Sequence, residues 1–157
     1  MPTVVQFRRG TTSQNNSFTG SAGELSIDTI LNTLRVHDGA TAGGNELLRK
    51  DLSNLVTVVS SIGASPVALD TFLTSAYRGG KYIITVSDVT NGQYQTSEIN
   101  IVQDGSTATI NSFGLVYSGA SARMTFTASI STGIVTLYGS GASVNNTVKL
   151  VRFLIPV

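Results

Sequence analysis

The sequence contains no cysteine, and this absence excludes disulfide bonds, thiolate catalysis and cysteine-based zinc sites. Charged residues are also scarce, at 12%, and the ten basic and nine acidic side chains form no block of one sign. A net charge of +1 without a basic cluster favours neither nucleic acid nor an acidic membrane as a partner. No apolar run approaches the roughly 20 residues that cross a bilayer, so we expect neither membrane insertion nor a signal peptide.

The residues that are present are those of β-sheets. Hydrophobic residues make up 41% of the chain, and much of the remainder is Gly, Ser, Thr and Asn, so polarity comes mainly from neutral hydroxyl and amide groups. Thr and Val fit a pleated, half-buried surface, whereas the long charged side chains that fill exposed helix faces are scarce. The composition therefore predicts a mainly β protein, and its length allows at most two compact parts.

Residues 1–45 predict a small β-module. Short strands are expected around Val4, over Glu24–Asp28 and over Thr33–His37, separated by turns that contain glycine. Strands of about five residues bury little apolar surface, so such a module is marginal by itself. We therefore expect it to pack on copies of itself.

The hydrophobic pattern changes period over residues 46–64. Leucine, valine and isoleucine recur at spacings of four, three, four and three, which is a heptad seam. One hypothesis is a short helical coiled-coil connector that sets the register of a homotrimer, because a helix this short needs neighbouring helices. The alternative is an extended linker, or a strand that packs on the next domain. In the coiled coil, the trimer interface would be formed by Leu48, Leu52, Leu55, Val59 and Ile62.

Residues 65–157 predict an antiparallel β-sandwich. Turn pairs such as Asn91-Gly92 and Asp104-Gly105 divide this part into eight candidate strands. Eight strands at this spacing indicate an eight-stranded sandwich or jelly roll. The predicted strands are Val67–Thr74, Lys81–Ser87, Gln95–Gln103, Thr107–Asn111, Leu115–Tyr117, Arg123–Ser129, Ile134–Tyr138 and Thr147–Ile155.

The last predicted strand is apolar on both sides. Alternation places one set of its side chains on one face and a second set on the other. Both faces need cover, which a central position in the sandwich or a contact with another subunit would supply. The two sets are Val148, Leu150 and Leu154 on one face and Val151, Phe153 and Ile155 on the other.

A run of short motifs resembles an N-terminal module of phage tail fibres and other virion appendages. The motifs are F-R-R-G-T-T from Phe7, A-G-E-L from Ala22, D-T at Asp28, N-T-L-R-V-H-D-G from Asn32 and T-A-G-G from Thr41. Only Ala40 departs from the Thr or Ser usual in that module. The pattern is a folding signature, because its glycines and aspartates close turns. The resemblance implies a trimeric β-module that docks a fibre on the particle, with Phe7, Arg8 and Arg9 as candidate attachment residues.

The C-terminal part is similar, more loosely, to β-sandwich heads of phage fibre and capsid-decoration proteins through the segment Ala76–Tyr82. These resemblances imply a structural virion protein, a trimeric tail fibre or spike subunit involved in host attachment. The alternative is a trimeric capsid decoration protein. The implied partners are tail, baseplate or major capsid proteins and a host cell-surface polysaccharide. The implied location is the virion, assembled in the host cytoplasm.

Few residues suit catalysis. His37 is the sole histidine, and beside Asp38 it reads as a strand-end imidazole entering a turn, because it has no plausible nucleophile and no cysteine with which to bind zinc. Asp88, Glu98 and Asp104 invite comparison with a glycosidase, but Asp88 and Asp104 flank turns, where carboxylates accept backbone hydrogen bonds. No phosphate-binding or calcium-binding loop motif occurs. We therefore expect no metal or cofactor and no enzymatic activity.

Aromatic and arginine residues near loops are the remaining candidates for recognition. Tyr94, Tyr77 and Arg78 are of the types that anchor recognition surfaces and stack on carbohydrate. The same tyrosines also suit half-buried strands or contacts between subunits. If a receptor is bound, the segments Asn91–Tyr94 and Gly139–Asn146 are the expected contacts.

Overall fold

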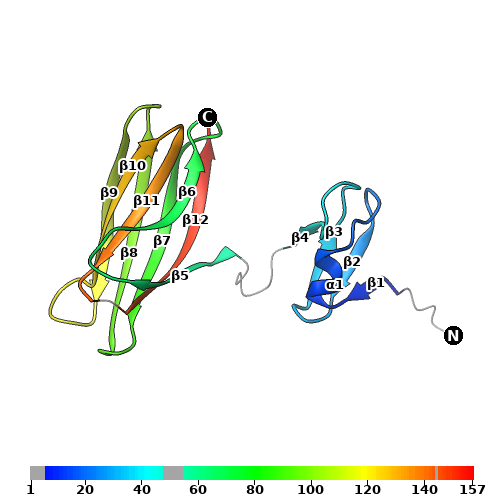
Figure 1. Ribbon diagram of the computed structural model, residues 1–157, viewed down its shortest axis with the longest axis horizontal. Helices are drawn as coiled ribbons and strands as arrows, with labels where there is room; N and C mark the ends of the chain where they lie inside the picture. The colour runs from blue at the N-terminus through cyan, green and yellow to red at the C-terminus, as the bar shows by residue number, and fades with distance from the viewer. Residues whose placement is uncertain (1–5, 48–54, 144) are drawn as a thin grey trace. The chain divides into compact units, whose positions relative to one another are not determined.

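The computed structural model describes residues 6–47, 55–143 and 145–157. The chain divides into two compact units, Met1–Leu55 and Val56–Val157, each with its own sheets (Figure 1). Within the described ranges, no helix is long and apolar enough to span a bilayer.

The N-terminal unit is a four-stranded sheet with one short helix. Strand β1 pairs in parallel with β2, and β2–β3 and β3–β4 are antiparallel, which gives the order β1-β2-β3-β4. A capping box formed by Thr11 and Gln14 starts the helix, because each side chain bonds a backbone N–H of the other residue. The elements are β1 (Arg8–Gly10), α1 (Thr12–Asn16), β2 (Leu25–Asp28), β3 (Thr33–Val36) and β4 (Asn45–Glu46).

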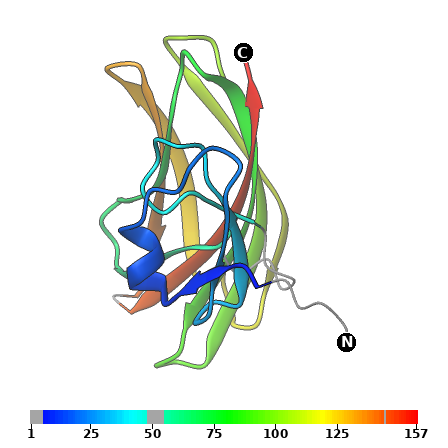
Figure 2. The same ribbon diagram turned by 90° about the vertical axis from the view of Figure 1, so that its right-hand side faces the viewer.

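The C-terminal unit is a sandwich of two antiparallel sheets, as the sequence predicted (Figures 1 and 2). One sheet has the order β10-β11-β6 and the other β5-β12-β7-β8-β9. Its strands are β5 (Thr57–Ile62), β6 (Val67–Leu73), β7 (Tyr77–Asp88), β8 (Gln93–Gln103), β9 (Ala108–Tyr117), β10 (Met124–Ser131), β11 (Ile134–Gly141) and β12 (Asn146–Pro156).

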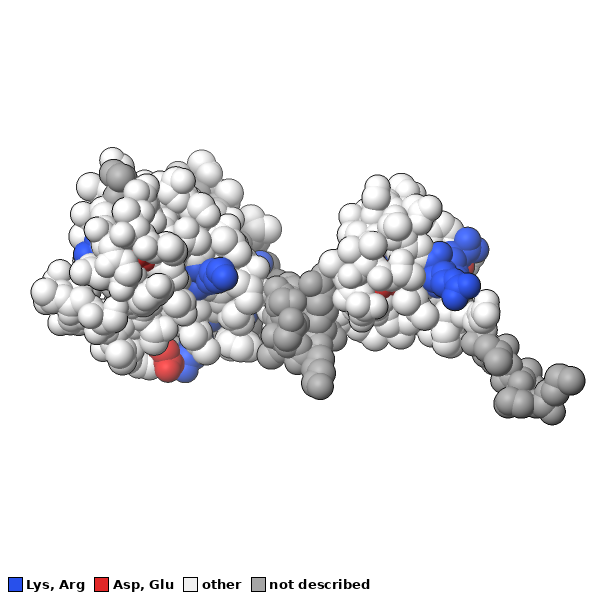
Figure 3. Space-filling view, turned by 90° about the horizontal axis from the view of Figure 1, so that it is seen from below, with Lys and Arg blue, Asp and Glu red and all other residues white. Residues whose placement is uncertain are grey.

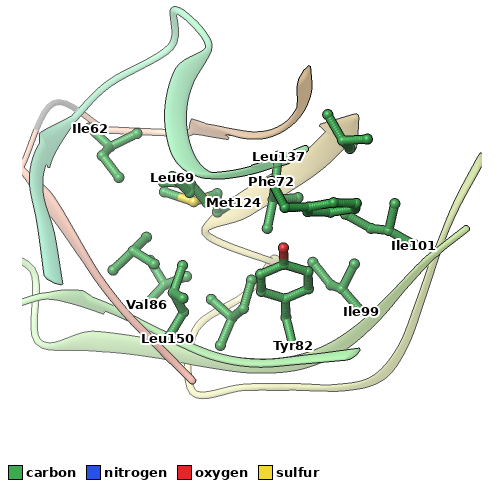
Figure 4. Packing of buried hydrophobic residues seen from close by; sticks show 13 residues of the cluster. Ile62, Leu69, Phe72, Tyr82, Val86, Ile99, Ile101, Met124, Leu137 and Leu150 are labelled. Atoms are coloured by element: carbon green, nitrogen blue, oxygen red, sulfur yellow. The ribbon is translucent and has the colours of Figure 1, made fainter. Parts of the chain in front are cut away.

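The core of the sandwich lies between the two sheets. Side chains from both layers meet there, including Tyr82 and Ile99 from one sheet and Leu137 from the other (Figure 4). Alternation produces this arrangement, because every second residue is buried over most of β7, β8 and β11 and over the first half of β12.

The coiled-coil hypothesis is wrong over residues 57–62, which form β5. This strand pairs with β12, so the C-terminal unit begins at Val56 rather than at residue 65. Ile62 is fully buried in the core of its own chain and Val59 packs against that core, so neither belongs to a helical trimer seam. Leu55 is exposed, and Leu48 and Leu52 lie outside the described residues. The helix prediction failed because β-branched residues with this spacing are equally compatible with a strand.

The sandwich has eight strands, but they are not the eight that were predicted, because two predicted strands are one and β5 was not among them. The predicted strands at 107–111 and 115–117 form one continuous strand, β9, whose pairing with β8 shifts between Thr96 and Glu98. Gly114 lies opposite this shift with a φ of +60°, a conformation that glycine adopts without strain. The sequence predicted a break at this glycine, whereas the strand continues through a bulge.

Candidate functional site

Asp28 and Arg35 form the polar centre of the N-terminal unit. Arg35 Nη2 lies 2.9 Å from Asp28 Oδ2, and both side chains are almost fully buried. Arg35 Nη1 also donates to Asn16 Oδ1 at 2.9 Å and to the Gly43 carbonyl at 3.1 Å. The pair thus joins strands β2 and β3, the end of α1 and the loop after β3.

Both aspartates of this module close turns, as the sequence predicted. Asp28 Oδ1 accepts the backbone N–H groups two and three residues later, at 3.1 and 3.0 Å. Asp38 Oδ1 does the same at 2.9 and 2.7 Å, and the Thr41 hydroxyl donates to its second oxygen. The bonds from the Thr41 hydroxyl and from the backbone lower the pKa of Asp38. The Asp38 carboxylate is therefore occupied by its own turn and does not pair with His37.

His37 is a buried structural residue. Its Nε2 lies 2.9 Å from Ser26 Oγ, and its Nδ1 accepts the Gly20 N–H at 3.3 Å. An added Cβ on Gly20 would lie 2.6 Å from His37 Cγ, so only glycine lets the backbone approach the ring here. Because Nδ1 accepts, neutral His37 carries its proton on Nε2 and donates to Ser26. This Ser–His pair is oriented the wrong way for a base that activates a serine.

The tautomer of His37 is a measurable consequence of this geometry. We expect long-range ¹H–¹⁵N spectra of the neutral form of the chain's single histidine to show the proton on Nε2. The Ser26→Ala variant should keep this tautomer, because the Gly20 N–H sets it. A proton on Nδ1 would contradict the proposed hydrogen bonds.

The candidate attachment residues have different environments. Arg8 is engaged within its own unit, because its Nε lies 2.7 Å from Glu24 Oε1 and its guanidinium lies 4.3 Å from the centre of the Phe18 ring. Phe7 and Arg9 are exposed. Of the three predicted residues, these two remain available for contact with another molecule.

At one end of the sandwich, the Asp88 carboxylate accepts hydrogen bonds from three loops. It accepts from Asn91 N and Nδ2 at 3.1 and 2.9 Å, from Ser143 Oγ at 2.7 Å and from Arg123 Nη2 at 2.9 Å. The loops between β7 and β8, β9 and β10, and β11 and β12 are thereby joined. The two segments predicted as receptor contacts, Asn91–Tyr94 and Gly139–Asn146, are thus brought together, which the sequence alone did not indicate.

The three predicted recognition residues do not form one site. Tyr94 is exposed near the Asp88 end of the sandwich and lines a shallow hollow with Thr96 and Val116. Tyr77 and Arg78 begin β7, whereas Asp88 ends it, so they lie at the opposite end of the sandwich. Tyr77 packs edge-on against the core residue Phe72, with ring centres 6.3 Å apart. Tyr94 is therefore the candidate best placed to act with the joined loops.

Asp70 is a further acidic residue of the sandwich, and the sequence did not single it out. Its carboxylate accepts from Arg152 Nη1 at 2.8 Å and from the Tyr82 hydroxyl at 3.0 Å, which links β6 to the opposite sheet. Burial raises the pKa of Tyr82, and the neighbouring Asp70 raises it further. A bulge in the pairing of β6 with β11 disturbs alternation here, so the sequence pattern gave no signal for an inward carboxylate.

The other carboxylates considered for catalysis have structural partners. Asp104 Oδ1 accepts the N–H groups of Ser106 and Thr107 at 2.9 and 2.7 Å, which confirms its predicted turn role. Glu98 lies 2.6 Å from Lys81 Nζ. Among the residues that the structure describes, no group of three His, Asp or Glu side chains is arranged to hold a metal ion.

Asp88 should make the sandwich sensitive to acid. Hydrogen bonds from Ser143 and Asn91 outweigh burial and, with Arg123, lower its pKa from 3.8 to about 2. A folded-state pKa below the unfolded value means that this stabilisation is complete above about pH 4 and is lost as the pH falls towards 2. We expect the melting temperature to fall over this window, and to fall less steeply in Asp88→Asn. Equal slopes for the two proteins would contradict this role of Asp88.

Comparisons with known proteins place the N-terminal unit beside phage proteins. Residues 5–41 match the family model described as the Major tropism determinant N-terminal domain. Over 52 residues the chain is 62% identical to the "Tail fiber receptor-binding protein" of Bordetella phage BPP-1, a match that covers 33% of this chain. The chain spans only 14% of the length of that relative.

Two solved structures are also similar. The Major Tropism Determinant U1 Variant aligns with 31% identity and a TM-score of 0.30, over 79% of this chain and 28% of that one. The tailspike protein of Acinetobacter phage vB_ApiP_P1 aligns with 16% identity and a TM-score of 0.47, over 78% of this chain and 28% of that one. The resemblance to phage tail fibre proteins that the sequence predicted is confirmed by the family match over residues 5–41.

Proposed function

We propose that this chain is a structural subunit of a bacteriophage tail fibre or spike that takes part in host attachment. The observation that carries the proposal is the 62% identity over 52 residues to a tail fibre receptor-binding protein. That relative is a tail fibre protein, which favours the tail over the capsid, the alternative location. In this proposal the chain acts by binding and not by catalysis.

The N-terminal unit is proposed to dock the subunit on other tail or baseplate proteins. Its internal polar groups bind one another, as the Asp28–Arg35 pair illustrates. The exposed Phe7 and Arg9 supply an apolar and a cationic contact beside the ordered strand β1. Arg9→Glu should therefore reduce incorporation into virions more than Arg8→Gln, because Arg8 already has Glu24 as its partner.

The C-terminal unit is proposed to present the host contact at the Asp88 end of the sandwich. Three loops converge there on a fixed framework, and Tyr94 offers an exposed ring for stacking on a sugar. Weak contacts suffice if the subunit is a homotrimer, since several heads per fibre and several fibres per particle raise the effective affinity. A cell-surface polysaccharide is the proposed ligand class.

Competition for adsorption tests the attachment role. Full-length purified chain, added to host cells before the phage that carries it, should slow adsorption, and Tyr94→Ala should compete less well than the unmodified chain. Tyr138→Ala is a matched control, because this tyrosine lies in the middle of β11 on the other sheet. If the chain does not compete at any concentration, the proposed host contact is wrong.

Two further measurements separate the alternatives. Copy number in purified virions distinguishes a fibre, with a few to a few dozen copies, from a decoration protein, which would be present in hundreds. Incubation with host polysaccharide tests the non-enzymatic proposal, because a depolymerase would release reducing sugar.

A further inference from the structure

The five-stranded sheet of the C-terminal unit has an apolar inner side, and its outer side exposes several large apolar side chains among polar ones. On β7, the buried residues Tyr82 and Ile84 point into the sandwich, and Ile83 between them points outward with 45% of its surface exposed. On β12, Val148 and Leu150 are buried, whereas Phe153 and Ile155 are exposed. Apolar side chains on both faces, which the sequence predicted for β12, therefore also occur on the adjacent strand β7.

Strand register gathers the outward apolar residues onto one surface. Residues opposite each other in an antiparallel sheet point to the same side. Ile83 lies opposite Glu98, which lies opposite Phe113, and Gly79 lies between Val102 and Ile155. We call this surface the apolar face, formed by Ile83, Val102, Phe113, Phe153 and Ile155, whose exposures range from 38% to 60%.

The other sheet provides an internal comparison. Its outward side chains are mainly hydroxylic, because Thr127 lies opposite Tyr138, and Thr136 lies between Ser129 and Thr71. That outer surface is mainly polar and faces solvent. The five-stranded sheet therefore exposes more large apolar side chains on its outer side than the other sheet does. Large exposed apolar patches mark interaction sites.

Charge on the apolar face is balanced within it. Lys81 Nζ lies 2.6 Å from Glu98 Oε2 and 5.6 Å from the centre of the Phe113 ring, so the pair adds no net charge. The surfaces of both units visible in Figure 3 likewise show few charged side chains. Gly79 leaves a hollow between Val102 and Ile155, which a protruding side chain of a partner would fill.

We propose that the apolar face packs against further copies of this chain and forms the contact of the homotrimer, an inference that rests on the proposed fibre subunit. Four strands about 4.8 Å apart and nine residues at about 3.3 Å give roughly 600 Å² of flat area. Stable complexes bury about 600–1,000 Å² of accessible surface per partner, so the face reaches the lower end of that range. Homo-oligomer contacts are apolar, as this face is, whereas sugar sites require convergent polar groups.

The mass of the full-length chain in solution tests this contact. We expect sedimentation of the unmodified chain to report about 49 kDa, three times its 16.4 kDa mass. Ile83→Glu and Phe153→Glu should sediment as single chains with unchanged far-ultraviolet circular dichroism, because both side chains are exposed in the monomer. Thr136→Glu on the hydroxyl side of the other sheet is the control and should remain assembled.

Cysteine labelling gives a second measurement that does not depend on disruptive charges. Because the natural chain has no cysteine, Ile83→Cys and Thr136→Cys each carry a single thiol. In the assembled protein, we expect Ile83→Cys to react with a thiol reagent at least about tenfold more slowly than Thr136→Cys, and the two rates to converge on dilution to monomer.

Two results would overturn the proposed contact, and they have different implications. Trimers that survive both glutamate substitutions and leave the thiol at residue 83 reactive would place the trimer contact elsewhere. A monomeric unmodified chain would overturn the trimer itself and leave the face to another virion protein. Neither result would decide host attachment, which the adsorption competition tests separately.

Discussion

The Arg35→Met variant should lose the folded N-terminal unit while its sandwich stays intact. The substitution leaves the Asp28 carboxylate buried without its counter-ion, and breaking a buried ion pair in this way costs about 3–5 kcal/mol. A unit of this size has little stability to lose. Amide hydrogen exchange should therefore show loss of protection in β2 and β3.

The five tyrosines provide a separate signal for the sandwich, because all of them lie in residues 56–157. Their near-ultraviolet circular dichroism should be unchanged in Arg35→Met. Arg8→Met is the matched control, since the Arg8–Glu24 pair is solvent-exposed and its loss should change stability little. If the two variants lost the same protection, the buried pair would not be what holds the unit together.

The Asp88→Ala variant should release three loops at once. The Arg123 side chain is only 12% exposed, and its guanidinium would lose its counter-ion. The Asn91 and Ser143 side chains would lose the acceptor of their hydrogen bonds. We expect the melting temperature of the sandwich to fall by on the order of 10 °C. Hydrogen exchange should accelerate in the β7–β8 and β11–β12 loops, and competition for adsorption should weaken with it.

Asp104→Ala is the matched control for this variant. Asp104 also closes a turn between two strands, but its side chain is exposed and its hydrogen bonds stay within its own loop. Its removal should lower the melting temperature by a few degrees at most. A comparable drop for both variants would show that Asp88 acts only on its own turn.

Features that depend on neighbouring residues were predictable from the sequence. The turns at Asp28, Asp38 and Asp104 follow from a carboxylate that accepts backbone N–H groups two and three residues later, and the sequence pattern contains both partners. The alternation of apolar and hydroxyl residues from Met124 to Ser131 likewise determines which side of β10 faces the core. These interactions are local, so the structure confirmed them.

Features that depend on distant residues were not predictable. Residues 57–62 carry a spacing that suits a helix or a strand, and only the open edge of β12 decides for the strand. Asp70 meets Arg152 across 82 positions of sequence, and Ser143 meets Asp88 across 55. No periodicity encodes such partners.

The sequence by itself determined the mainly β class, the antiparallel sandwich of residues 65–157 and the kinship of residues 5–41 with phage tail fibre modules. Composition, alternation and local turn chemistry are sufficient for these, because each acts over a few residues. Only the tertiary structure decided that Asp88 joins the candidate contact loops, and that Ile83, Phe113 and Phe153 share one exposed surface. Strand order and register bring those residues together, and both are set by packing between segments far apart in the chain.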